Sequence, residues 1–140
     1  MRKIFTVVIL TLLLTACGGA SQPATEFTLD TSDFAYSIPS LTVKVGETVQ
    51  LTLNNIGVLE HDFVIEKIDV TTKVIQDSGS EEHGAHGAEA NYDLHVSAQV
   101  GETSIIQFTV NEPGTYQFFC SVPGHKDAGM VGELIVVAEE

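Results

Sequence analysis

Residues 115–137 read TYQFFCSVPGHKDAGMVGELIVV, and this stretch indicates both the fold and the chemistry of the chain. Its two ends are apolar and have the composition of short β-strands, and a loop rich in proline and glycine connects them. Within the loop, Cys120 is followed five residues later by His125 and five further on by Met130. A tight loop between two strands is a rigid support, so we expect the three side chains to converge.

The residue types in this loop predict a copper site. A thiolate and a thioether are soft ligands and imidazole is borderline, a combination that suits copper. Electron-transfer copper sites use one thiolate, two imidazoles and a weak axial methionine, so a second histidine is required. We expect it to be His61, which follows a turn containing Gly57 and begins the apolar segment 62–66. The alternative, that Cys120 and Met130 are ordinary core residues, is disfavoured because all four side chains occur together.

The rest of the chain has the pattern of an all-β domain. Short apolar or alternating segments are separated by turn residues, at positions 27–29, 41–45, 48–53, 62–66, 94–97 and 104–110. No long stretch beyond the N-terminal segment keeps a helical period, so helices should be short or absent. We therefore predict one antiparallel β-sandwich or barrel over residues 26–140.

Three further histidines are interpreted as solvent-facing residues. Residues 78–91, SGSEEHGAHGAEAN, interrupt the strand pattern and predict a long inserted surface loop that carries His83 and His86. A loose second metal site in this loop is the alternative that stays open. His95 alternates with its two apolar neighbours, so we predict that it points to the solvent face of its strand.

The N-terminal segment predicts export and lipidation. Residues 1–16, MRKIFTVVILTLLLTA, combine two basic residues, an apolar run and small residues, as in a lipoprotein signal peptide that is too short to span a membrane convincingly. LTAC at residues 14–17 resembles the bacterial lipobox, which implies that Cys17 is acylated and becomes the new N-terminus. Residues 17–25 would then form a flexible tether. We expect an exported domain that faces the periplasm or the exterior, anchored by lipid to the cell membrane or outer membrane.

The composition restricts the partners. The chain has 19 acidic and 6 basic residues, a formal charge of −13. This charge disfavours nucleic acid, whose phosphates require lysine and arginine. It favours a redox protein with a basic docking surface, met through electrostatic steering. The alternative is that the acidity only keeps an exported protein soluble.

The motifs together resemble the cupredoxins, the plastocyanin/azurin superfamily of blue copper proteins, and the metal loop is most similar to that of the auracyanins. The resemblance extends from about Phe27 to Val137 and includes EHDFV at residues 60–64 and PGTY at residues 113–116. It implies a Greek-key β-sandwich or barrel that binds one type 1 copper ion through His61, Cys120, His125 and Met130. Many members carry asparagine directly after the first histidine ligand, where it links the two ligand segments. Asp62 stands there in this chain, so we expect the link to be weaker or replaced.

The resemblance also implies a function. We expect a type 1 copper protein, not an enzyme, that carries single electrons between redox partners outside the cytoplasm. The outer ring edge of His125 should reach the surface inside an apolar collar of Val122, Pro123 and Ala128. Copper storage or delivery in the cell envelope uses the same ligands and remains an alternative. Copper oxidases and nitrite reductases need further copper centres, for which the sequence offers no second set of strong ligands, and an adhesion module would not need these ligands.

Overall fold

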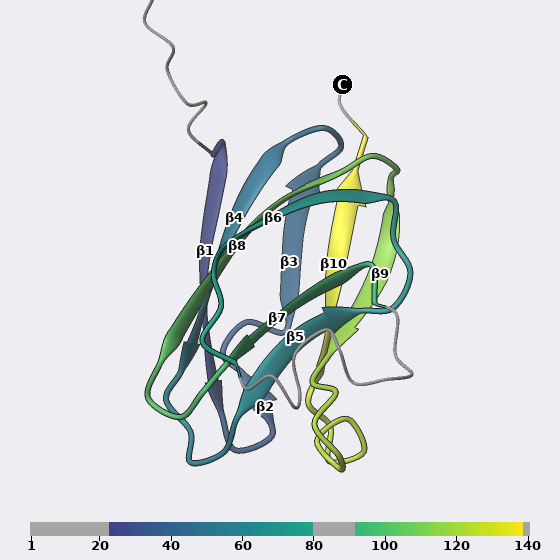
Figure 1. The fold of residues 1–140 in the computed structure, drawn as a ribbon. Helices are drawn as coiled ribbons and strands as arrows, with labels where there is room; N and C mark the ends of the chain where they lie inside the picture. The colour runs from purple at the N-terminus through teal and green to yellow at the C-terminus, as the bar shows by residue number, and fades with distance from the viewer. Residues whose placement is uncertain (1–22, 80–91, 139–140) are drawn as a thin grey trace, which may run out of the picture.

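The computed structural model of the protein describes residues 23–79 and 92–138. These residues form ten β-strands and contain no helix that could cross a membrane (Figure 1). The strands are β1 (Thr25–Ser32), β2 (Ala35–Tyr36), β3 (Ser40–Lys44), β4 (Thr48–Asn55), β5 (His61–Ile65), β6 (Val70–Gln76), β7 (Leu94–Ala98), β8 (Thr103–Val110), β9 (Gly114–Phe119) and β10 (Val131–Val137). The predicted signal peptide, the predicted lipidation site Cys17, most of the predicted tether and most of the predicted inserted loop with His83 and His86 lie outside the described residues.

The strands form two five-stranded sheets, with the orders β2-β1-β4-β8-β6 and β3-β10-β9-β5-β7. The all-β sandwich class is therefore confirmed. The predicted antiparallel pairing holds for most neighbouring strands but is wrong for two pairs, because β1 pairs with β4 and β3 pairs with β10 in parallel. The two strands of each of these pairs are distant along the chain. No hairpin therefore fixes their relative direction.

Alternation of apolar and polar residues produces the core between the sheets. Along β4 and β8 every second residue is buried, and the apolar members of the two strands lie opposite each other, as Leu51 does with Ile106. The largest fully buried side chains include three phenylalanines, Phe63, Phe108 and Phe118. Each such side chain contributes about 1.5–3 kcal/mol through removal of its surface from water, so the two sheets hold each other firmly.

Two strands were not predicted from the sequence. β6 is an edge strand whose residues are mostly exposed, including Val74 and Ile75, and its pairing with β8 shifts between Val74 and Gln76. An exposed edge strand needs no apolar face, so it carries no alternation to detect. β2 has only two residues and pairs with the end of β1.

The loops gather functional residues at one end of the sandwich. The β9–β10 loop lies at the same end as the β1–β2 turn and the β4–β5 loop (Figure 1). The described chain begins and ends at the opposite end (Figure 1). The ends of the described chain are thus well separated from the loop that contains Cys120 and His125.

Candidate metal centre

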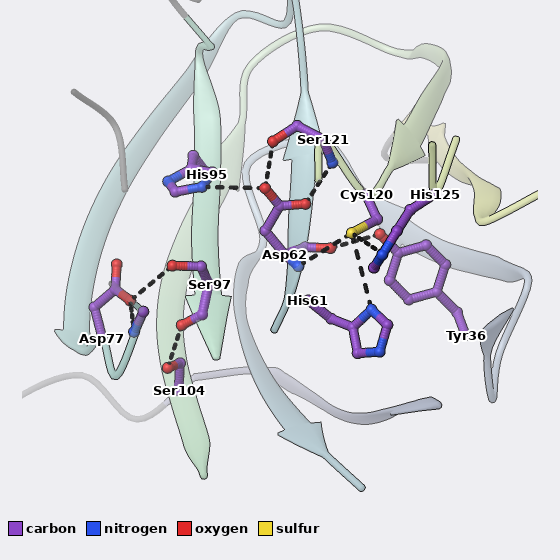
Figure 2. A network of polar contacts seen from close by, with 11 residues as sticks. Tyr36, His61, Asp62, Asp77, His95, Ser97, Ser104, Cys120, Ser121 and His125 are labelled. Carbon is purple, nitrogen blue, oxygen red and sulfur yellow. Dashed lines mark hydrogen bonds and ion pairs between the residues drawn. The ribbon is translucent and has the colours of Figure 1, made fainter. Parts of the chain in front are cut away.

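Three of the four predicted ligands meet at one buried point. Cys120 directly follows β9, His61 is the first residue of β5, and His125 lies in the loop between β9 and β10. Cys120 Sγ is 3.3 Å from His125 Nδ1 and 4.0 Å from His61 Nδ1 (Figure 2). Donor atoms bound to one ion through bonds of about 2.0–2.3 Å lie at about such separations. His61 and Cys120 are fully buried, and His125 is only 3% exposed.

Strand pairing explains why residues so distant along the chain meet. Val64 of β5 lies opposite Phe119 of β9 in an antiparallel pair. Continuing this register brings the start of β5 beside the residues that follow β9. Pairing of β5 with β9 therefore makes His61 and Cys120 neighbours, although they are distant in the sequence.

Backbone hydrogen bonds fold the loop back on itself. The His125 amide donates to the Val122 carbonyl at 3.0 Å, and the Met130 amide donates to the His125 carbonyl at 3.0 Å. The Cys120 amide donates to the Met130 carbonyl at 3.1 Å, which brings the two ends of the loop together. Gly129 has a φ of 99°, a conformation that favours glycine, at the point where the chain turns into β10. Met130, the predicted axial ligand, is fully buried.

The chemistry of the donors suits a metal ion. Burial, followed by the nearby charge of Asp62, raises the pKa of the Cys120 thiol to about 12. Burial also lowers the pKa of both His61 and His125, and the two imidazoles are neutral near pH 7 as a result. In the metal-free protein the thiol is therefore protonated. A bound cation would displace this proton and compensate the thiolate charge, as metal ligation by cysteine requires.

A family comparison fits this geometry. Residues 23–137 match the family model for copper binding proteins of the plastocyanin/azurin family. The chain belongs to this family. Its cysteine, two histidines and methionine have the arrangement of a blue copper site and fit one type 1 copper ion.

Three named copper proteins are similar to this chain in sequence. Auracyanin-A from Chloroflexus aurantiacus is 28% identical, with 97% of this chain and 96% of that protein covered. A plastocyanin from Prochlorothrix hollandica is 27% identical, with 90% of this chain and 82% of that protein covered. The copper-resistant cuproprotein CopI from Rubrivivax gelatinosus is 32% identical over 100 residues, which are 69% of this chain and 56% of that relative's length.

Solved structures share the cupredoxin fold. Reduced auracyanin from Roseiflexus castenholzii superposes with a TM-score of 0.60 at 25% identity, covering 85% of this chain and 99% of that one. A multicopper oxidase from Campylobacter jejuni gives a TM-score of 0.60 at 15% identity, but only 34% of its chain is covered. This likeness shows a shared domain fold.

Asp62 replaces the link that asparagine makes in many cupredoxins. Its carboxylate accepts hydrogen bonds from the Ser121 amide at 2.6 Å and from the Ser121 hydroxyl, so it joins the start of β5 to the metal loop (Figure 2). Its own amide donates to Cys120 Sγ at 3.5 Å, and the Tyr36 hydroxyl donates to its carbonyl at 2.6 Å. Burial alone would raise the pKa of Asp62, but the contacts from His95 and Ser121 outweigh burial and hold this pKa below its usual value. The carboxylate is therefore ionised beside the donor sulfur.

The prediction that His95 faces solvent is wrong. His95 does point away from Leu94 and Val96, but its side chain is only 6% exposed, and its Nε2 lies 3.6 Å from Asp62 Oδ2. This distance is that of an ion pair and is too long for a hydrogen bond. The outer face of β5 is itself buried, and the Tyr92 ring stacks at 6.2 Å from the His95 ring. The alternation of residues correctly predicted the strand face on which His95 lies, but it did not predict that other residues bury that face.

His125 keeps 3% of its surface exposed, so the part of the imidazole that reaches solvent is small. The collar residues Pro123 and Ala128 are exposed and Val122 is partly buried, yet His125 itself is buried. The ring of Phe34, from the β1–β2 turn, packs edge to face on the imidazole, with the ring centroids 5.0 Å apart. No local pattern indicates this contact, because it joins a loop residue and a turn residue that are 91 positions apart.

Asn55 is a further residue that the sequence did not identify. It is 1% exposed, and its amide group donates to the carbonyls of Leu59 and Ala98 at 2.7 and 2.9 Å and accepts from the Gly57 amide at 2.9 Å. These bonds shape the loop that leads into His61. Gly57 packs so closely on His61 that an added Cβ would lie 2.9 Å from Nε2. The Asn-Asn pair at a strand end was the available signal, but it indicated only a turn.

Proposed function

We propose that this protein carries single electrons between redox partners outside the cytoplasm, with one copper ion held by His61, Cys120, His125 and Met130. The convergence of a buried thiol and two neutral imidazoles on one point is the observation that carries this proposal. Copper supplies the one-electron chemistry, because it is stable as both Cu(II) and Cu(I). The relatives named plastocyanin and auracyanin support the same function.

The protein's part is to hold the donors still. Pairing of β5 with β9, the Asp62 link to Ser121 and the Asn55 bonds fix the segments on both sides of the site. Buried, hydrogen-bonded side chains have few alternative positions, so the donors should move little when the charge of the ion changes. Small movement lowers the barrier to electron transfer.

The visible absorption spectrum and the voltammogram of the copper-loaded protein test this proposal. We expect an intense visible band in the oxidised state, its disappearance on reduction, and a reversible one-electron wave. A loaded protein without the band, or one that loses its copper on each reduction, would contradict an electron carrier.

Copper handling for resistance, storage or delivery is the second candidate. Relatives named copper-resistant cuproprotein favour it, including the one from Rubrivivax gelatinosus. Delivery requires the metal to leave easily, whereas the three donor residues given above are at most 3% exposed. Rapid transfer of copper to a copper-free acceptor protein, faster than electron exchange with a redox partner, would favour delivery over electron transfer.

The partner is proposed to be a redox protein with an apolar centre and a basic rim. Exposed apolar side chains flank the metal loop at this end of the sandwich, from the β1–β2 turn and the β4–β5 loop: Phe34, Ile56, Val58 and Leu59. These four side chains extend the apolar collar of Val122, Pro123 and Ala128, and the name collar covers all seven residues from here on. Asp33 and Asp127 lie in the turn and the loop that carry collar residues. Apolar contact with an acidic rim suits brief, electrostatically steered association.

A charge placed in the collar should slow electron exchange. We expect Val122→Glu to reduce the second-order rate with the partner about tenfold, because a buried unpaired charge costs at least about 1.4 kcal/mol at an interface. Stopped-flow mixing with the redox partner measures the rate, and the visible band should stay unchanged. Val137→Glu is the matched control, because Val137 is exposed at the far end of β10. Equal slowing by both substitutions would exclude the collar as the docking surface.

The location is proposed from the N-terminal segment. Export and a lipid anchor at Cys17 would attach the domain through the end opposite the metal loop, where the described chain begins (Figure 1). The collar would then face away from the membrane that holds the anchor. Cys17→Ala should move the protein from the membrane fraction to the soluble fraction of the cell envelope, and retention in the membrane would contradict the anchor.

A further inference from the structure

The outer face of the sheet β2-β1-β4-β8-β6 has an uncharged centre. Along β4 and β8 every second residue points outward and keeps part of its surface exposed, and none of these outward residues is charged. All are threonine, glutamine or asparagine except Ile105. The chain has 19 acidic and 6 basic residues, so a broad face without a carboxylate at its centre departs from the rest of the composition. Depletion of charge at the centre of a patch is typical of protein interfaces.

Cross-strand hydrogen bonds hold this polar face in one arrangement. β4 and β8 are antiparallel, and their outward residues lie directly opposite one another in pairs. Side-chain hydrogen bonds join three of these pairs: Thr48 with Thr109 at 3.4 Å, Gln50 with Gln107 at 3.0 Å, and Asn54 with Thr103 at 3.1 Å. The remaining outward pair is Thr52 with Ile105. Side chains that are already held in place lose little conformational freedom when a partner covers them.

Two opposite charges flank the uncharged centre on a single row across the sheet. Gln50 and Gln107 form the middle of this row. On one side Glu26 of β1 lies opposite Gln50, and on the other side Lys73 of β6 lies opposite Gln107. Both end residues are exposed, and among residues 23–79 and 92–138 neither has an ion-pair partner. From β1 to β6 the row therefore reads acid, amide, amide, base.

Two further carboxylates near this face are already bonded within the chain. Asp30, on β1, accepts a hydrogen bond from the Asn54 side-chain amide at 2.9 Å. Asp77, directly after β6, accepts from the Gly79 amide at 2.9 Å and from the Ser97 hydroxyl at 3.4 Å. Because Ser97 belongs to β7 of the other sheet, the Asp77 carboxylate is turned away from the outer face. Glu26 and Lys73 are thus the charges that the face offers to a partner.

The order of charges along the row is complementary to itself. A two-fold axis that is parallel to the strands and lies over the line between β4 and β8 exchanges the two sides of the sheet. It places β1 of one copy against β6 of the other, so Glu26 meets Lys73 at both edges. At the centre, Thr52 of one copy meets Ile105 of the other. The same face can therefore serve both copies without bringing like charges together on this row.

We propose that this face binds a second copy of the chain, with Glu26 and Lys73 forming two ion pairs around the uncharged centre. Four strands about 4.8 Å apart and about eight residues long present roughly 500 Å² per copy. The total of about 1,000 Å² is at the lower limit for a specific interface, so the dimer is weak in solution. The axis leaves both metal loops at one end of the dimer and both chain starts at the other (Figure 1). The proposed lipid anchors could then enter one membrane, which raises the effective concentration, but the dimer does not depend on them.

Reversal of the two charges tests the proposed dimer. Sedimentation equilibrium of the full chain in density-matched detergent measures the dissociation constant. Glu26→Lys and Lys73→Glu each create two like-charged pairs, so we expect each to weaken the dimer about tenfold. The double variant restores opposite charges and should return to within about threefold of the wild type. An equimolar mixture of the two single variants should also associate as the wild type does, because every lysine then meets a glutamate of the other copy.

Lys44→Glu is the matched control, because it makes the same charge change at an exposed position of β3 in the other sheet. It should leave the dissociation constant unchanged, and mixing it with Glu26→Lys should restore nothing. Ile105→Glu, which places a charge at the centre, should abolish the dimer. Circular dichroism checks that each variant folds, and recovery in the mixture excludes misfolding as the cause of weak association.

A full chain that sediments as a monomer up to the highest soluble concentration would overturn the proposal. A dimer that ignores both charge reversals, or a mixture that associates no better than its components, would overturn it as well. None of these measurements requires electron transfer, so failure of the dimer and failure of the proposed function are distinguishable.

Discussion

Replacement of Cys120 by alanine is expected to abolish the intense visible band and tight Cu(II) binding. Cys120 Sγ lies 3.3 and 4.0 Å from the imidazole nitrogens of His125 and His61, so its loss removes the one thiolate from the donor set. The two imidazoles alone form a weaker and more symmetric site, which has no sulfur from which to transfer charge. Absorption spectroscopy and copper titration of the purified variant measure both effects.

The chain contains its own control for this prediction. Cys17 is the other cysteine in the sequence, and Cys17→Ala should leave the band and the copper stoichiometry intact. Circular dichroism of copper-free Cys120→Ala should match the copper-free wild type, because the substitution removes a small side chain from a core built on both sheets. A Cys120→Ala protein that remains blue would refute the ligand assignment.

The sequence predicted well whatever depends on local spacing. Cys120, His125 and Met130 belong to one loop, and the backbone bonds that close this loop span ten residues or fewer. Alternation likewise predicted most core strands, because burial of one face of a strand acts at every second residue. The assignment of His61 as a ligand depended on an assumption about which strand lies beside the metal loop. The pairing of Val64 with Phe119 confirms that His61 lies beside Cys120.

The sequence predicted solvent exposure less well, because exposure depends on which distant residues pack against a side chain. His95 and His125 were both expected to reach solvent, one on an outer strand face and one on a loop. The His95 side chain is only 6% exposed and lies 3.6 Å from Asp62, and His125 keeps 3% of its surface exposed with the Phe34 ring packed against it. Position in an element sets the direction of a side chain, but its exposure depends on tertiary packing, which a single sequence does not display.

Asp62 is expected to control both stability and potential, and two substitutions separate these roles. Asp62→Ala removes the acceptor of two Ser121 hydrogen bonds and the partner of His95. The partly buried Ser121 donors would be left unpaired and the buried His95 imidazole would lose its polar neighbour, so we expect the copper-free protein to lose about 3 kcal/mol of unfolding free energy. Urea denaturation measures this loss. A loss below about 0.5 kcal/mol would mean that water or another group replaces the carboxylate at little cost.

Asp62→Asn keeps the size of the side chain and one acceptor oxygen but removes the charge. The ionised carboxylate follows His61 directly, and its own amide contacts Cys120 Sγ. A buried negative charge on the residue next to a ligand stabilises Cu(II) more than Cu(I), since the oxidised ion carries the larger positive charge. We therefore expect Asp62→Asn to raise the reduction potential, with a stability loss smaller than that of Asp62→Ala. Removing this charge should also lower the pKa of the Cys120 thiol from about 12.

Glu133→Gln provides the matched control, because it makes the same change from acid to amide at an exposed position on β10. Solvent and salt screen an exposed charge, so this variant should keep the wild-type potential. Voltammetry of the three proteins at one ionic strength compares them directly. If Asp62→Asn and Glu133→Gln gave the same potential, the buried carboxylate would carry no charge in the copper-loaded protein. Its link to Ser121 would then be purely structural, and the tuning role would fall while the ligand assignment stood.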